Sequence, residues 1–326
     1  MMGREILERL VNGERLDEGE AYLMMRGVME GNFSLVQLGA MLAVLQMRGE
    51  EGEELSGFVR AVREKAVPFS VSSQVPVADN CGTGGDNAGT FNISTAAALL
   101  SVSVGIKMVK HGNRSVTSRS GSADFLEHLG IPVEASPEAM RFLFEKTGFA
   151  FLYAPRYHPA MRAVQGVRKE LGIRTVFNLL GPLVNPCAVD YKLVGVYDPR
   201  LLEPVGMVLG TLRVKRGLVV FGEPGMDEVS LAGESQMALW EEGAMRFFTF
   251  HPREVGLPQC SLADLQGGTP EENVHIFLDI LRGKERGALR KAVLLNAAFL
   301  LWLSERTFSV AEALGLLEAA IESGRA

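Results

Sequence analysis

The alternation of strand-like and helix-like segments from about residue 75 onward is the feature that most restricts the fold. Short apolar runs such as PVADN, GIKMVKHG, FAFLYAP, YKLVGVYD and RGLVVFGE are separated by segments with helical spacing, among them TAAALLSVSV and EAMRFLFEKTG. Ser136 followed by Pro137 marks the start of one such helix, and Ser94 and Thr95 are expected to cap another. MALWEEGAMRFFTF predicts a hairpin. Strand–helix–strand repetition predicts a largely parallel sheet with helices on its faces.

The first 66 residues or so predict helices only. Ser34 followed by Gln37 is a capping-box pattern, and apolar residues follow at helical spacing at Leu35, Leu38, Leu42 and Leu45. VPFSVSSQVPVA then indicates a linker. The predicted fold class is therefore α/β, with a small all-helical domain (1–68) plus a larger α/β domain (69–326) that has a mostly parallel central sheet.

Composition and charge exclude several classes of protein. The net charge of −6 over 326 residues argues against a nucleic-acid binder. Cys81, Cys187 and Cys260 show neither metal spacing nor a disulfide pattern, which favours the cytoplasm. The charged N-terminus has no apolar core typical of a secretory signal. The apolar stretch AVLLNAAFLLWL is interrupted by Asn296 and falls short of the roughly 20 residues of a membrane span. We therefore expect a cytoplasmic protein with no nucleic-acid or membrane partner.

The stretch DNCGTGGDNAGTFNIST, residues 79–95, crowds four glycines among small polar side chains. It is neither a dinucleotide fingerprint nor a Walker loop, because Asn87 and Thr90 stand where those motifs need Gly and Lys. Glycines let successive N–H groups point into one concavity, and a helix N-terminus at Ser94 and Thr95 favours anions. The stretch predicts a cradle for a polyanion. The alternative is a glycine-rich turn that binds nothing.

Three further stretches carry candidate chemistry. KHGNRSVTSRSGSAD, residues 110–124, gathers cations and hydroxyls, although a solvated basic loop is the alternative. Asp227 and Glu228 follow a predicted strand and suit Mg²⁺ bridged to substrate phosphates, unless they are only a wet acidic loop. The segment 156–186 holds several arginines, which can bind a carboxylate through paired hydrogen bonds. Its alternative is a helix with a wet basic face.

Together these stretches resemble the anthranilate phosphoribosyltransferase family. The matching motifs, in chain order, are GTGGD at 82–86, TFNIST at 90–95, KHGNR at 110–114, SGSAD at 120–124, YHPAM at 157–161, RTVFNLLGPLVNP at 174–186 and MDE at 226–228. The resemblance implies a small helical domain and a larger α/β domain with the active site in the cleft between them. It also implies that a segment around 167–183 returns to the small domain. Thr117 stands where the family often has Ser, and VQGVR at 164–168 departs from commoner forms.

The resemblance further implies transfer of the phosphoribosyl group of phosphoribosyl pyrophosphate to the amine of anthranilate, with Mg²⁺ and release of pyrophosphate. The implied phosphoribosyl pyrophosphate site comprises Gly82, Gly85, Asp86, Thr90, Asn92, Ile93, Ser94, Thr95, Lys110, His111, Gly112, Asn113, Arg114, Ser115, Val116, Thr117, Ser118 and Ser122. The implied anthranilate site comprises Gly82, Asn113, His158, Arg168 and Pro182. The implied metal ligands are Ser94, Asp227 and Glu228. His111 and Asn113 are the expected catalytic residues, although an aromatic amine needs positioning more than a strong base.

Two other functions and the oligomeric state stay open at this stage. A pyrimidine-nucleoside phosphorylase shares the fold, but it would bind inorganic phosphate and has no use for a carboxylate clamp such as Arg168. A non-enzymatic relative that binds nucleic acid is disfavoured by the net charge of −6 and by the acidic pair. A homodimer formed through the first 66 residues is expected from the stripe of Leu35, Leu38, Leu42 and Leu45. The alternative is that this stripe packs inside its own chain.

Overall fold

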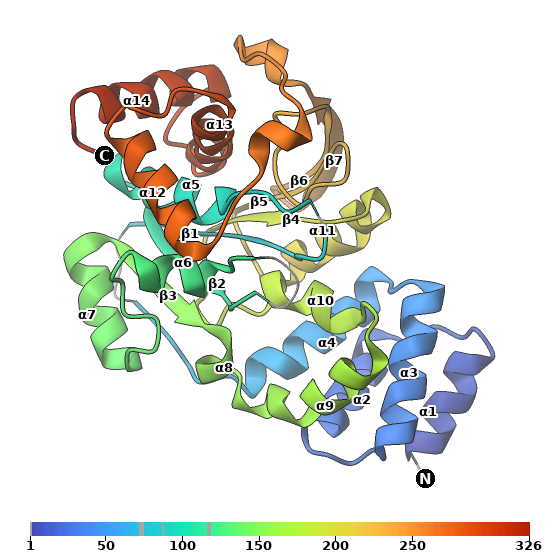
Figure 1. Ribbon diagram of the computed structural model, residues 1–326. Helices are drawn as coiled ribbons and strands as arrows, with labels where there is room; N and C mark the ends of the chain where they lie inside the picture. Colours follow the sequence, from blue (N-terminus) through green and yellow to red (C-terminus); the bar gives the residue numbers. More distant parts are fainter. Residues whose placement is uncertain (1, 72–74, 87, 116–118) are drawn as a thin grey trace.

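The computed structural model describes residues 2–71, 75–86, 88–115 and 119–326. Its N-terminal part is a bundle of four helices at the lower right of Figure 1: α1 (Met2–Val11), α2 (Glu18–Met29), α3 (Leu35–Arg48) and α4 (Gly52–Glu64). Ser34 caps α3 and forms the predicted capping box with Gln37. The expectation of an all-helical N-terminal part is confirmed.

The rest of the chain is built on one seven-stranded sheet with the order β3-β2-β1-β4-β5-β6-β7. The strands are β1 (Val77–Gly82), β2 (Lys107–Gly112), β3 (Phe149–Tyr153), β4 (Tyr191–Gly195), β5 (Arg216–Gly222), β6 (Ser235–Glu241) and β7 (Ala244–Phe250). The first five are parallel. β6 and β7 are antiparallel and form the predicted hairpin. The mostly parallel sheet is therefore confirmed.

Helices cover both faces of this sheet (Figure 1). They are α5 (Ile93–Ser103), α6 (Ser122–His128), α7 (Pro137–Thr147), α8 (Ala154–Tyr157), α9 (Arg162–Leu171), α10 (Val176–Leu180), α11 (Leu202–Thr211), α12 (Pro270–Leu281), α13 (Ala288–Leu303) and α14 (Val310–Glu322). α5 and α13 pack on one face, and α11 packs on the other face beside α4. Ser136 caps α7 as predicted. The predicted cap of α5 is wrong, because that helix begins at Ile93 with Asn92 as its N-cap and Ser94 and Thr95 lie in the first turn.

The helical bundle shares its core with one face of the sheet. Successive residues of a strand point to opposite faces, so in β4 Leu193 packs with α5 and α13 while Val194 packs with the bundle. Leu38, Leu42 and Leu45 are buried in that shared core. These three side chains therefore stabilise their own chain, and they do not provide the dimer contact that the sequence suggested. Leu35 alone of the stripe is exposed.

A later segment packs against the bundle as well. α9 contacts α2 and α3, and α10 contacts α3 and α4. Val164, Val167, Val176 and Phe177 lie in the core of the bundle. This packing is consistent with the return of about 167–183 to a small helical domain. The domain limits at 1–68 and 69–326 stay a prediction.

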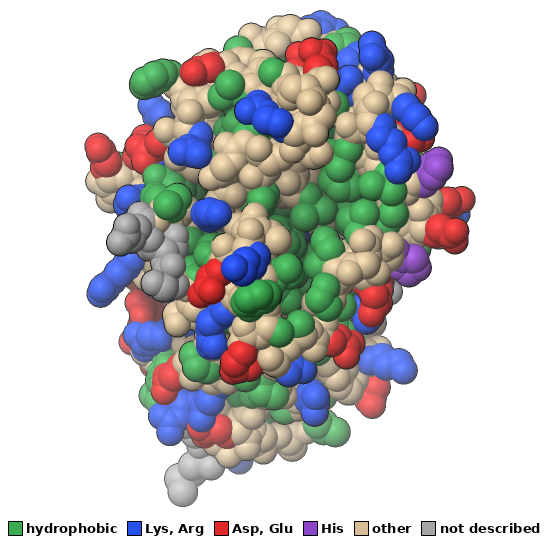
Figure 2. Space-filling view, turned by 90° about the vertical axis from the view of Figure 1, so that its left-hand side faces the viewer, with side chains coloured by type: hydrophobic (Ala, Val, Ile, Leu, Met, Phe, Trp, Pro, Cys, Tyr) green, Lys and Arg blue, Asp and Glu red, His purple; other side chains and the backbone are tan. Residues whose placement is uncertain are grey.

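The surface carries charges of both signs. In the face shown in Figure 2, charged side chains are spread over both ends of the molecule and hydrophobic side chains gather across its middle. Within the described part of the chain, every helix is too short or too polar to span a bilayer.

Candidate active site

The glycine loop after β1 and the acidic pair after β5 are in direct contact. The Gly84 N–H donates a hydrogen bond to Asp227 Oδ2 at 2.7 Å, and the Ser94 N–H donates to Glu228 Oε1 at 3.1 Å. A Cβ atom at Gly82 would lie 2.0 Å from Asp227 Oδ2, so this close approach requires glycine. The two stretches converge at the carboxyl ends of the parallel strands, where ligands of such sheets bind.

The acidic pair is not a wet loop, since Glu228 is only 9% exposed. Burial, and then the charge of Asp86, raises the pKa of Asp227 above its usual range. Burial, and then the charge of Asp227, raises the pKa of Glu228. A hard cation at this position would offset the repulsion between these oxygens. Within the described residues, no group of three His, Cys, Asp or Glu side chains is placed to hold a metal. Further ligands would therefore be the Ser94 hydroxyl, water and substrate oxygens.

The second loop begins on β2, beside the glycine loop. Lys110 is buried, and its Nζ lies 2.5 Å from the carbonyl oxygen and 3.2 Å from Oδ1 of Asn80. Asp79, also buried, pairs with Lys192 and accepts a hydrogen bond from the His111 N–H at 3.3 Å. Burial alone would raise the pKa of Asp79, but the Lys192 ammonium brings that pKa below its usual value. The sequence analysis missed this buried charge network, which joins β1, β2 and β4.

The guanidinium of Arg114 is already engaged within the protein. It pairs with Asp124, Glu127 and Glu134 and lies 5.6 Å from the centre of the Tyr153 ring. These carboxylates therefore occupy the guanidinium that was predicted to bind a phosphate.

The neighbours of Arg114 differ in their exposure. Asn113 is exposed, and its Oδ1 accepts a hydrogen bond from the Arg114 N–H at 2.8 Å. The Ser115 N–H donates to Asp124 Oδ2 at 3.1 Å. Gly112 ends β2, and a Cβ atom there would lie 3.3 Å from Cβ of Ser122, the first residue of α6. Three predicted site residues, Val116, Thr117 and Ser118, lie outside the described residues.

Two buried histidines connect the second loop to the returning segment. The rings of His111 and His158 meet edge to face with centroids 5.1 Å apart, and His111 Nδ1 lies 3.0 Å from the Gly181 carbonyl oxygen. Burial lowers the pKa of His111 to about 4 and that of His158 to about 3. Both rings are therefore neutral near pH 7, and neutral imidazole can accept a proton. His111 Nε2 is buried without a hydrogen-bond partner in the described part of the chain. Pro182, next to Gly181, is buried.

Arg168, the predicted carboxylate clamp, comes from the segment that packs against the bundle. It lies half-buried on α9, with its guanidinium carbon 5.5 Å from the centre of the Phe177 ring. Burial lowers the pKa of Arg168. No carboxylate among the described residues pairs with this guanidinium. None of the contacts found within the described residues joins Arg168 to Gly82 or Asn113, the other residues predicted to bind the aromatic substrate.

The remaining predicted residues line the glycine loop and the first turn of α5. The Asp86 Oδ1 accepts a hydrogen bond from the Ala88 N–H at 3.1 Å. Ile93 and Thr95 are each 1% exposed, so their backbones rather than their side chains could meet a ligand. Thr90 is half-exposed and forms a bridge with Gln266. The Gly85 carbonyl accepts a hydrogen bond from Arg174, whose guanidinium lies 4.2 Å from the centre of the Tyr197 ring. The sequence analysis did not assign this role to Arg174.

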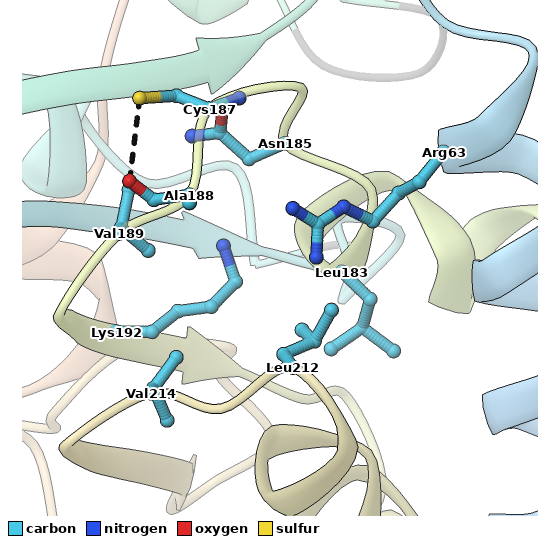
Figure 3. Close-up of a pocket in the computed structure, with 9 residues that line it drawn as sticks. All are labelled: Arg63, Leu183, Asn185, Cys187, Ala188, Val189, Lys192, Leu212 and Val214. Carbon is cyan, nitrogen blue, oxygen red and sulfur yellow. Dashed lines mark hydrogen bonds between the residues drawn. The ribbon is translucent and has the colours of Figure 1, made fainter. Parts of the chain in front are cut away.

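A small cavity lies between α4 and the sheet, beside Lys192 of the buried charge network (Figure 3). Arg63 enters it from α4 and Lys192 from β4, beside Asn185 and Cys187. Its volume of about 10 Å³ has room for about one water molecule. The cavity is too small for a substrate of the size that the loops predict.

Two family models match the chain. The helical bundle domain of a glycosyl transferase family matches residues 4–66, and the a/b domain of a glycosyl transferase family matches residues 74–326. Among relatives, anthranilate phosphoribosyltransferase of Moorella thermoacetica is 47% identical over 98% of this chain and 94% of its own length. The enzyme of Aquifex aeolicus is 43% identical over 99% and 95%, respectively.

Solved structures agree with these relatives. Anthranilate phosphoribosyltransferase of Thermus thermophilus superposes with a TM-score of 0.91 at 44% identity, over 98% of this chain and 95% of that one. The Saccharomyces cerevisiae enzyme in complex with PRPP and Mg superposes with a TM-score of 0.89 at 27% identity, over 99% and 94%.

The fold and the site define a class, the glycosyl transferases that join a helical bundle to an α/β domain. The family models of both domains match this chain, and together they cover nearly all of it. Within that class, the chain belongs to the anthranilate phosphoribosyltransferase family.

Proposed function

We propose that this enzyme transfers the phosphoribosyl group of 5-phosphoribosyl 1-pyrophosphate to the amine of anthranilate, in tryptophan biosynthesis. The observation that carries the proposal is the direct contact between the glycine loop and the partly buried acidic pair, through Gly84–Asp227 and Ser94–Glu228. A glycine loop suited to phosphate oxygens and carboxylates suited to a divalent cation occur side by side. That combination suits a diphosphate substrate.

In the proposed reaction, the bond between ribose C1 and the pyrophosphate oxygen breaks, and the amine nitrogen of anthranilate forms a bond to C1. Positive charge develops on the sugar, as in glycoside cleavage, and the electron pair of the broken bond leaves with pyrophosphate. Mg²⁺, held by Asp227, Glu228 and Ser94, would supply charge compensation for that leaving group. The nitrogen loses one proton, to water or to a neutral imidazole such as His111.

Arg168 is the residue proposed to select an aromatic carboxylate. An arginine that is half-buried, unpaired among the described residues and packed on the Phe177 ring can bind a carboxylate while its neighbours contact an aromatic ring. We assign His158, Pro182, Asn113 and Gly82 to the same substrate. A nucleoside phosphorylase would have no carboxylate for this arginine.

The proposal includes a cytoplasmic homodimer. Cys81, Cys187 and Cys260 are free thiols, which supports a reducing compartment. The dimer is proposed to form through the helical bundle.

One assay tests the reaction. Anthranilate is fluorescent, so its fluorescence should fall when enzyme, phosphoribosyl pyrophosphate and Mg²⁺ are all present, with release of one pyrophosphate per anthranilate consumed. Each component is omitted in turn as a control. A stable signal from folded enzyme, together with phosphate-dependent cleavage of a pyrimidine nucleoside, would replace the proposal by the phosphorylase alternative.

A further inference from the structure

A buried asparagine outside the predicted site contacts it from behind. Asn273 lies in the first turn of α12 and is 1% exposed. Its Oδ1 accepts a hydrogen bond from the Gly268 N–H at 2.7 Å, and its Nδ2 donates to Asn92 Oδ1 at 2.8 Å. Asn92 belongs to the glycine loop. The oxygen and the NH₂ group of a buried side-chain amide usually both have hydrogen-bond partners. Here the NH₂ group of Asn273 bonds a residue that is assigned to the phosphoribosyl pyrophosphate site.

Asn92 in turn joins the two loops of that site. Its Nδ2 donates to the Ser120 carbonyl oxygen at 3.0 Å, and its Oδ1 accepts from Ser120 Oγ at 2.9 Å. Because a carbonyl can only accept, Ser120 fixes which end of the Asn92 amide carries the NH₂ group. The oxygen of Asn92 must then face Asn273, which presents a matching donor.

The segment in front of α12 lies along the same loop. The Phe91 N–H donates to the Leu265 carbonyl at 2.9 Å, and the Gly267 N–H donates to the Gly89 carbonyl at 3.0 Å. A Cβ atom at Gly267 would lie 2.8 Å from Phe91 Cα, so the two backbones are in contact there. The segment that leads into α12 is therefore bonded to the glycine loop, and Asn273 adds a side-chain contact between the same two parts of the chain.

We propose that Asn273 is a positioning residue for the diphosphate site. By donating to the amide oxygen of Asn92 beside Ser120, it holds the glycine loop and Ser120 in the relative arrangement that binds the phosphates of phosphoribosyl pyrophosphate. The inference rests on the proposed function. It assigns Asn273 no contact with substrate.

Two variants of Asn273 and one control separate this role from helix stability. Asn273→Asp keeps the shape and the acceptor for Gly268 but removes the donor to Asn92, and Asn273→Ala removes both. Thr269→Ala removes the N-cap bond to the Glu272 N–H, 3.3 Å long, at the same end of α12 and leaves Asn92 untouched. For each protein we would measure KM for both substrates, kcat, the thermal midpoint of unfolding and calorimetric binding of pyrophosphate with Mg²⁺.

We expect both Asn273 variants to raise KM for phosphoribosyl pyrophosphate about tenfold, since the partly buried Asn92 Oδ1 loses one of its two donors, and to weaken pyrophosphate binding in parallel. KM for anthranilate should change less than twofold. Thr269→Ala should lower the thermal midpoint without either effect. Unchanged pyrophosphate binding in the Asn273 variants, equal losses for both substrates, or the same losses in Thr269→Ala would overturn the positioning role. If the parent enzyme does not turn over anthranilate, the proposed function fails, and the pyrophosphate titration still decides the role of Asn273.

Discussion

Asn296 hydrogen-bonds both backbone groups of Val229. Its Oδ1 accepts from the Val229 N–H at 3.0 Å, and its Nδ2 donates to the Val229 carbonyl at 3.0 Å. Asn296 is 2% exposed and interrupts the otherwise apolar helix α13. Val229 directly follows Asp227 and Glu228. The Asn296 amide therefore satisfies both backbone groups of Val229, as a paired β-strand would. It fixes the backbone next to the acidic pair.

Replacing Asn296 should damage both stability and metal dependence. Asn296→Ala leaves a buried N–H and C=O without partners, which should lower the free energy of unfolding by about 1–3 kcal/mol. It should also raise the Mg²⁺ concentration needed for half-maximal activity. Urea unfolding and titration with Mn²⁺ followed by electron paramagnetic resonance check the two effects. Asn32→Ala, at an exposed position, is the control. Stability equal to that of the parent would show that water replaces the lost bonds.

Neutralising the acidic pair should abolish transfer and spare the fold. Asp227→Asn with Glu228→Gln keeps acceptors for the Gly84 and Ser94 N–H groups. It also removes two carboxylate charges whose pKa values are raised by burial first and by the neighbouring carboxylates second. We expect turnover to be lost across a Mg²⁺ titration, with a thermal midpoint no lower than that of the parent. Glu223→Gln, exposed at the same strand end, should behave like the parent. Normal turnover of the double variant would place the metal elsewhere.

Removing the guanidinium of Arg168 should act on one substrate. A hydrogen bond to a charged group contributes roughly 1.5–3 kcal/mol, so Arg168→Ala should raise KM for anthranilate about tenfold or more. KM for phosphoribosyl pyrophosphate should change little. Steady-state kinetics with each substrate varied in turn gives both values, and Lys169→Ala, exposed on the same helix, serves as the control. Equal losses for both substrates would indicate a folding defect and not a carboxylate clamp.

Glu50 should make the stability of the protein depend on pH. It is buried between α3 and α4, and burial, reinforced by Glu54, raises its pKa from 4.5 to about 7. Because the folded-state pKa is the higher one, Glu50 destabilises the fold progressively as pH rises from about 4.5 through about 7. Glu50→Gln should remove this dependence and gain about 1–3 kcal/mol at pH 8 relative to pH 5.

Urea unfolding at several pH values between 5 and 8 checks the role of Glu50. Glu53, an exposed glutamate three residues further on, provides the matched control. The variant Glu53→Gln should keep the pH dependence of the parent. Parallel curves for the parent and Glu50→Gln would contradict a raised pKa at this carboxyl.

The outer face of α3 is the part of the helical bundle through which the proposed dimer would form. Val36 and Met47, which are 83% and 82% exposed, lie eleven residues apart, close to three helical turns, so they share one stripe with Ala40 and Val44. Light scattering should give the mass of a dimer at micromolar concentration. Val36→Glu with Met47→Glu should shift that mass toward the monomer without changing the circular dichroism of the helices. A monomeric parent protein would end the proposal.

Local features of the fold were predictable because their signals lie within a few residues of one another. Ser34 with Gln37 and Ser136 with Pro137 each place a side chain or a fixed φ angle beside the first turn of a helix, and both helices start there. The β6–β7 hairpin follows from neighbouring apolar runs in the same way. The glycine loop was recognisable because only glycine allows the backbone to approach other groups so closely.

What the tertiary structure decided are contacts between residues far apart in the chain. Leu38 faces inward while Val36 faces outward. Each belongs to an apolar stripe at helical spacing, so the spacing alone does not show which stripe is buried. Arg114 is committed to three carboxylates. Lys192 pairs with Asp79, 113 residues away, and Asn273 reaches Asn92 across 181. Polar side chains of one type have the same local pattern whether they face water, a ligand or a distant backbone. Only the packing of the sheet and its helices determines which of these each one meets.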